Sequence, residues 1–151
     1  MTQVAFHIGI DDRVGYACRL VRKVLASGAK ALVLADAATL RRLDEALWVS
    51  EAAGFTPHAM AGAPTTIAAR SPALLAEQVP ENLASDAVLI NMTGSVQNDP
   101  HSRERLIELV SGEEFDIQAA RQRWKTYKQR GFSLVNHDVR HGSTMKTPDS
   151  G

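Results

Sequence analysis

The sequence predicts an α/β protein, a Rossmann-like three-layer sandwich in which helices cover both faces of a mainly parallel sheet. Two observations lead to this prediction. Short apolar runs alternate with helical patterns along the chain, which is the order of consecutive βαβ units. The run at 31–35 contains no polar residue, as expected for a parallel strand that is buried on both faces. With 151 residues, 44% of them hydrophobic, the chain is long enough for one core but hardly for two.

The first strand and the first helix are predicted close to the N-terminus. Residues Val4–Ile10 are rich in β-branched and aromatic side chains, which favour a strand. Between residues 14 and 25 apolar side chains recur every three or four positions, which indicates a helix packed on a sheet, and Gly28 ends it. Asp11 and Asp12 can cap this helix, although an acidic pair after a strand can also bind Mg²⁺.

A second strand and helix repeat the same order. The strand is predicted at Ala31–Ala35, and Asp36 stands where the next helix begins. This helix extends to about Ser50, and Pro57 excludes a helical conformation beyond it. Its predicted buried face consists of Leu40, Leu43, Ala46 and Leu47.

The middle of the chain is less regular. Further strands are predicted at Thr65–Ala69, Ala87–Asn91 and Leu106–Val110. The segment 71–85 is predicted to be irregular or only partly helical, because Pro72 and Pro80 interrupt it.

The C-terminal part begins with a long helix, predicted from Glu113 to about Arg130 and ended by Gly131. Phe132–Val135 is predicted to form an edge strand. The last residues have almost nothing to bury. We therefore expect one domain at 1–138, followed by a flexible tail at 139–151.

The composition limits the classes of function. Seventeen basic residues balance seventeen acidic ones, so no global positive field attracts nucleic acid. Cys18 is the single cysteine, which leaves no thiol for a disulfide or a Cys-based zinc site. No apolar run approaches the roughly 18 residues of a membrane span, and no signal peptide is recognisable. We expect a cytoplasmic protein that does not contact a membrane.

The motifs of common enzyme classes are missing. The segment Gly9–Gly15 lacks the glycine spacing of a dinucleotide site, and the chain contains no Walker A sequence and no nucleophile elbow. Of the five histidines, His137 and His141 are four residues apart, but they fall at a predicted strand end and in the tail and not on one helix, so a metal site is not expected there. We expect neither a catalytic residue, nor a metal, nor a cofactor. The alternative is an enzyme for a nucleotide or phosphorylated ligand, with Asp11, Asp12 and Asp36 at the carboxyl edge of the sheet.

The segment 120–132 combines cations with aromatic residues. The helical period places Arg121, Lys125 and Lys128 on one stripe. Trp124 and Tyr127 fall on a second stripe, about 100° away. An apolar side chain could therefore pack on Trp124 while Arg121 binds a carboxylate, and both contacts are typical of binding hot spots. A short acidic peptide with an apolar last residue would fit such a site.

Two other interpretations use the same residues. Trp124 and Tyr127 could complete the core, with the cations gathered near the end of the helix because its dipole favours them there. Alternatively, single-stranded DNA could bind directly by stacking a base on Trp124, although the zero net charge argues against it.

Three blocks of the sequence resemble one family, the chi subunit of bacterial DNA polymerase III. The first block is Leu43–Trp48 followed by Phe55–Gly62, similar to the family pattern L-D-E-x-L-W…F-x-P-H-x-x-x-G. The second is the strand at Val88–Met92. The third is Ala120–Phe132, similar to A-R-x-R-[YW]-K-x-Y…G-[FY]. The resemblance runs from the first strand to about residue 135, and these three blocks carry it.

The resemblance implies a non-catalytic adaptor that joins the clamp loader to single-stranded-DNA-binding protein, and so reaches DNA only indirectly. The acidic C-terminal tail of that protein would place its last aromatic residue in a pocket. The residues implied for this tail site are Arg121 for the carboxylate, Trp124 and Val110 for the pocket wall, and Lys125 and Lys128 as supporting cations.

A second partner implied by the resemblance is the psi subunit, where one exists. Its interface would include Phe55 with the neighbouring Trp48, although Phe55 could equally fill the core. One position departs from the family, because Ile117 stands where some relatives carry a lysine, which makes the tail site less cationic.

Overall fold

The computed structural model describes residues 3–49, 59–60, 73–79, 87–97, 105–140 and 143–145, and of residues 49, 59–60 and 143–145 it describes the backbone alone. The strand predicted at Thr65–Ala69 and the residue Phe55 lie outside these ranges. None of the helices in the described ranges is long and apolar enough to span a membrane.

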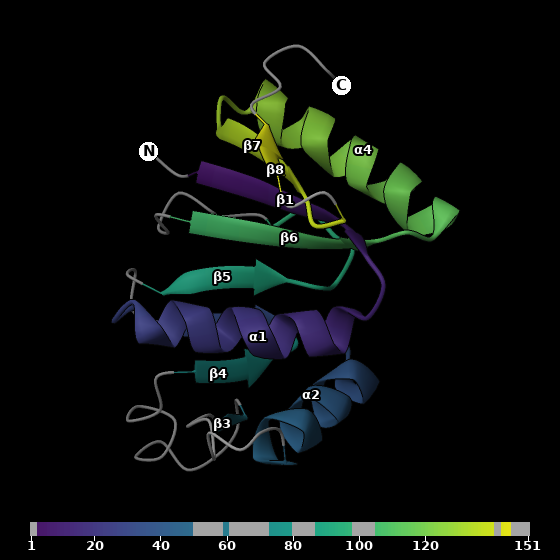
Figure 1. Ribbon diagram of the computed structural model, residues 1–151. Coiled ribbons are helices and arrows are strands. Elements are labelled where there is room, and N and C mark those ends of the chain that lie inside the picture. Colours follow the sequence, from purple (N-terminus) through teal and green to yellow (C-terminus); the bar gives the residue numbers. More distant parts are fainter. Residues whose placement is uncertain are drawn as a thin grey trace.

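The described strands form one eight-stranded sheet in the order β3-β4-β2-β5-β6-β1-β7-β8. All neighbouring pairs are parallel except β7 and β8. In Figure 1 α4 lies beside β1 and β7, whereas α2 lies near β3 and β4. The strands are β1 (Gln3–Ile10), β2 (Ala31–Leu34), β3 (Ala59–Met60), β4 (Ala73–Ala76), β5 (Val88–Asn91), β6 (Arg105–Ser111), β7 (Ser133–Asp138) and β8 (Ser143–Met145); the helices are α1 (Arg13–Ala26), α2 (Ala37–Val49) and α4 (Glu114–Gln129).

The helices begin and end at the predicted residues for local reasons. Asp12 caps α1, where its carboxylate accepts a hydrogen bond from the Gly15 amide at 3.1 Å. Asp36 accepts hydrogen bonds from the amide and the hydroxyl of Thr39 at the start of α2. Gly131 follows α4 with a φ of 88°, a conformation that ends helices and favours glycine. The capping role predicted for Asp12 is therefore confirmed.

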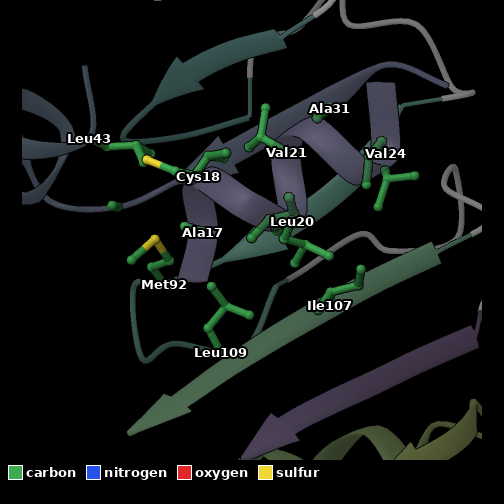
Figure 2. Close-up of a cluster of buried hydrophobic side chains, with 14 of the residues drawn as sticks. Ala17, Cys18, Leu20, Val21, Val24, Ala31, Leu43, Met92, Ile107 and Leu109 are labelled. Carbon is green, nitrogen blue, oxygen red and sulfur yellow. The ribbon is translucent and has the colours of Figure 1, made fainter. Parts of the chain in front are cut away.

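Two apolar clusters lie on opposite faces of the sheet, as the predicted three-layer sandwich requires. On one face α1 and α2 pack on the strands, and Figure 2 shows Cys18 and Val21 of α1 together with Leu43 of α2 and Ile107 of β6. On the other face α4 packs through Ala120, Trp124 and Tyr127 against side chains that include Phe6 and Leu106. The alternation of side chains along each strand supplies both clusters.

The structure corrects the prediction for 71–85. Residues Ala73–Ala76 form the buried strand β4, which pairs with β2 and β3. Pro72 and Pro80 flank this strand instead of interrupting it, and a proline outside a strand removes no hydrogen bond from the ladder. The apolar run at Ala73–Ala76 is only four residues long, and such a short run does not show from sequence that it is a strand or which strands it pairs with.

The C-terminal strands also differ from the prediction. β7 was expected at the sheet edge, but it lies between β1 and β8. Within the segment expected to be a flexible tail, Ser143–Met145 form β8, antiparallel to β7. Backbone pairing supplies a partner for these residues although they have little apolar surface to bury.

The crossover from β6 through α4 to β7 positions the site. β6 and β7 are the two neighbours of β1, so α4 passes over β1. Because these three strands are parallel, their carboxyl ends meet at one edge, and α4 starts at that edge. Such an edge is where open α/β sheets commonly bind ligands.

Candidate binding site

A cavity of about 370 Å³ lies between the carboxyl ends of β1, β6 and β7 and the first half of α4. Its walls come from segments far apart in the sequence. Its lining consists of Phe6, Ile8 and Gly9, Val110 and Gly112, Ile117, Ala120, Arg121 and Trp124, and Asn136 and Arg140.

Two aromatic side chains, Phe6 and Trp124, form part of the cavity wall. The rings of Trp124 and Phe6 are 5.2 Å apart between centroids, with 58° between their planes. Trp124 is only 7% exposed, so it belongs to the core and lines the cavity at the same time. Tyr127 is fully buried and does not line the cavity. The alternative interpretation, in which these rings merely complete the core, therefore holds for Tyr127, whereas Trp124 is buried in the core and also lines the cavity.

The cavity has a cationic side chain on α4. Arg121 is exposed and lines the cavity, and within the described ranges no group accepts a hydrogen bond or forms an ion pair with it. An unpaired guanidinium beside an aromatic wall can bind a carboxylate whose apolar neighbour enters the cavity.

The structure brings together three of the five residues predicted for tail binding. Arg121, Trp124 and Val110 line one cavity, as the prediction requires. Lys125 and Lys128 are exposed on α4 but do not line it. As exposed cations on the same helix they can add to the general attraction of an acidic ligand, to which screened charges contribute little.

A buried polar network beside the cavity was not predicted. Glu108 of β6 accepts hydrogen bonds from Arg123 Nε at 3.0 Å, from the Tyr127 hydroxyl at 2.8 Å and from Asn91 Nδ2 at 2.9 Å. Glu108 is 0% exposed and Arg123 3%. Arg123 also donates to the carbonyl oxygen of Gly94 at 3.1 Å. The network therefore attaches α4 to β6 and to the segment after β5.

The charges of this network depend on one another. Burial raises the pKa of Glu108, whereas the Arg123 guanidinium and the hydrogen bonds from Asn91 and Tyr127 lower it. Burial and the neighbouring Glu108 raise the pKa of the Tyr127 hydroxyl. We infer an ionised carboxylate, because three donors surround it and one of them carries a permanent charge. A single glutamate within the apolar run 106–110 was the signal that sequence reasoning overlooked.

The other predicted residues lie elsewhere. Trp48 is 59% exposed on α2, and its predicted neighbour Phe55 lies outside the described ranges. Asp12 and Asp36 cap helices, which accounts for them without a ligand. In the part of the chain that the structure describes, no group of three or more histidine, cysteine, aspartate or glutamate side chains could hold a metal ion.

Comparisons with known proteins agree on one family. The family described as DNA polymerase III chi subunit, HolC, matches residues 1–135. A DNA polymerase III subunit chi from Pseudomonas aeruginosa is 32% identical over 142 residues, which cover 91% of this chain and 96% of that protein. The subunit chi of Haemophilus influenzae is 27% identical over 124 residues, covering 82% and 85% of the two chains. That of Escherichia coli is 30% identical over 118 residues, covering 78% and 79%.

Proposed function

Because this chain belongs to the family of DNA polymerase III chi subunits, which are replication accessory subunits, we propose that it is a non-catalytic adaptor of the polymerase holoenzyme. In this proposal it binds the acidic C-terminal tail of a single-stranded-DNA-binding protein and links that protein to the clamp loader in the cytoplasm.

One observation carries the proposal: an aromatic wall and a guanidinium that has no partner among the described residues belong to the same cavity. Arg121 and Trp124 are three positions apart on α4, so they lie on adjacent sides of the helix and both reach the hollow. A peptide end offers the complementary pair, a terminal carboxylate and, on the same residue, an aromatic side chain. A cavity of about 370 Å³ is large enough for one such side chain.

Replacing Arg121 with alanine is expected to weaken binding of a fluorescent acidic peptide that ends in Pro-Phe by about 1.5–3 kcal/mol, because a charged hydrogen bond is lost. Fluorescence anisotropy measures this affinity directly. Removing the terminal Phe from the peptide should abolish binding, because the cavity then remains empty.

The matched control is Arg42→Ala. It removes the same charge from an exposed position on α2, which packs on the opposite face of the sheet. Its affinity should equal that of the unsubstituted protein. Equal losses in Arg121→Ala and Arg42→Ala would show that only general charge attracts the peptide, and full affinity in Arg121→Ala would remove Arg121 from the site.

The same proposal includes a second partner, the psi subunit. Trp48 supports it, because more than half of this large apolar side chain is exposed on α2, away from the cavity. Phe55 remains part of the proposed interface. Trp48→Ala is expected to weaken psi binding in a titration calorimetry experiment and to leave the affinity for the tail peptide unchanged, since the two surfaces are separate.

A further inference from the structure

We propose that Arg140 is a second cation of the tail site and binds a side-chain carboxylate of the acidic peptide, upstream of the terminal carboxylate that Arg121 binds. This inference rests on the proposed function. Arg140 lies beyond residue 135, where the match to the family ends. It nevertheless lines the same cavity as Arg121, from the turn that follows β7.

The Arg140 side chain is held in place by Asp138. The Asp138 carboxylate accepts hydrogen bonds from Arg140 Nε at 3.1 Å and Nη2 at 3.0 Å, and from the Arg140 amide at 3.0 Å. The Val139 amide donates to the carbonyl oxygen of Ile8 at 3.1 Å, which ties this turn to β1. A guanidinium with a fixed orientation loses less conformational entropy when it binds a second carboxylate.

The end of β1 leaves space for this arrangement at Gly9. A Cβ atom at Gly9 would lie 2.5 Å from Arg140 Nε and 3.0 Å from the Asp138 carboxylate, so any larger residue would displace the pair. Gly9 also has a φ of 73°, which disfavours other residues. Gly9 therefore allows Arg140 and Asp138 to lie close to the end of β1.

Arg140 still has donors for a ligand. The bonds to Asp138 use Nε and Nη2, and the guanidinium carries further N–H groups. Its side chain is 60% exposed, whereas that of Asp138 is 12% exposed. A ligand can therefore reach Arg140 more easily than Asp138. Because Asp138 offsets its charge, we expect Arg140 to contribute through a directed hydrogen bond more than through long-range attraction.

The occupant that fits is an acidic peptide with two carboxylates near its end. Arg121 and Arg140 line the cavity from two different elements, α4 and the turn after β7, and apolar side chains such as Ile8 line the same cavity. A terminal residue seated on Trp124 would place its own carboxylate at Arg121, and an upstream carboxylate of the same peptide could then bind Arg140. A peptide without upstream carboxylates would use Arg121 alone.

A double-mutant cycle between protein and peptide tests this inference. Arg140→Ala is expected to lower the affinity for the acidic peptide about two- to fivefold at low salt, which is the range measured for exposed charge pairs. It should not change the affinity for a peptide in which the upstream Asp residues are replaced by Asn. Amidating the peptide C-terminus should instead abolish the effect of Arg121→Ala and preserve that of Arg140→Ala.

Two further variants support the reading of the cycle. Arg140→Gln keeps much of the side chain but removes the charge, so it should behave as Arg140→Ala. Arg42→Ala should leave the affinities for all peptides unchanged. Circular dichroism and thermal unfolding verify that each variant is folded.

The outcomes separate the two proposals. If the unsubstituted protein does not bind the acidic peptide, both fail. A second outcome is that binding depends on Arg121 while Arg140→Ala either leaves the affinity unchanged or lowers it equally for the acidic and the Asn-substituted peptide. In either case the tail site stands and the role proposed for Arg140 is wrong.

Discussion

Replacing Arg123 with alanine is expected to destabilise the protein by about 3–5 kcal/mol, because it leaves the buried Glu108 carboxylate without its charged partner. The pair is almost fully inaccessible to water, with side chains 0% and 3% exposed. Asn91 and Tyr127 would still donate to Glu108, but neither carries a charge. The same change removes the hydrogen bond from Arg123 to Gly94, which connects α4 to the segment after β5.

Urea unfolding followed by circular dichroism measures this loss. The midpoint should fall while the slope of the free energy against urea stays the same, because the surface exposed on unfolding is unchanged. Arg121→Ala is the matched control, since it removes an exposed arginine two positions earlier on α4 and should alter stability by no more than about 0.5 kcal/mol.

A double variant tests the cause. Glu108→Leu combined with Arg123→Met replaces the ion pair with apolar side chains and should recover most of the stability lost in Arg123→Ala. A loss below about 1 kcal/mol in Arg123→Ala would show that water reaches the Glu108 carboxylate and that the network contributes little.

Acid is expected to destabilise the protein through His7, by up to about 3 kcal/mol between pH 6.5 and pH 4. Burial, His137 and the cations Arg105 and Lys23 lower the pKa of His7 to about 4 from its usual 6.5. The imidazole contacts the rings of Tyr16 and His137 and is hydrogen-bonded to the Tyr16 hydroxyl. The folded state therefore favours neutral His7.

The direction of the effect follows from proton binding. Between pH 6.5 and 4 the unfolded chain takes up a proton at His7 and the folded protein does not, so stability falls as the pH falls through this range and levels off below it. The pKa of Glu108 is raised in the folded protein, so protonation of Glu108 favours the folded state as the pH falls and opposes the effect of His7. The measurement is therefore the difference in unfolding free energy between the protein and His7→Asn at several pH values. A difference that does not change with pH would contradict the prediction.

The sequence alone was sufficient for several features that depend on local spacing. The strand at the N-terminus, the caps at Asp12 and Asp36 and the glycine stop at Gly131 were predicted and are observed. The helical period also selected Arg121 and Trp124 as neighbours that could serve one ligand, and both line the cavity. The physical reason is that a helix or strand has a fixed period, so residue spacing determines which side chains share a face.

Tertiary structure decided which faces meet. The spacing in α4 could not show that Arg123 turns inward to Glu108, because the partner belongs to a strand fifteen residues away. It could not show that Gly9 and Arg140 border the same hollow, or that β7 has neighbours on both sides. Strand order and the contacts between layers depend on the free energy of packing the whole chain, which no local pattern encodes.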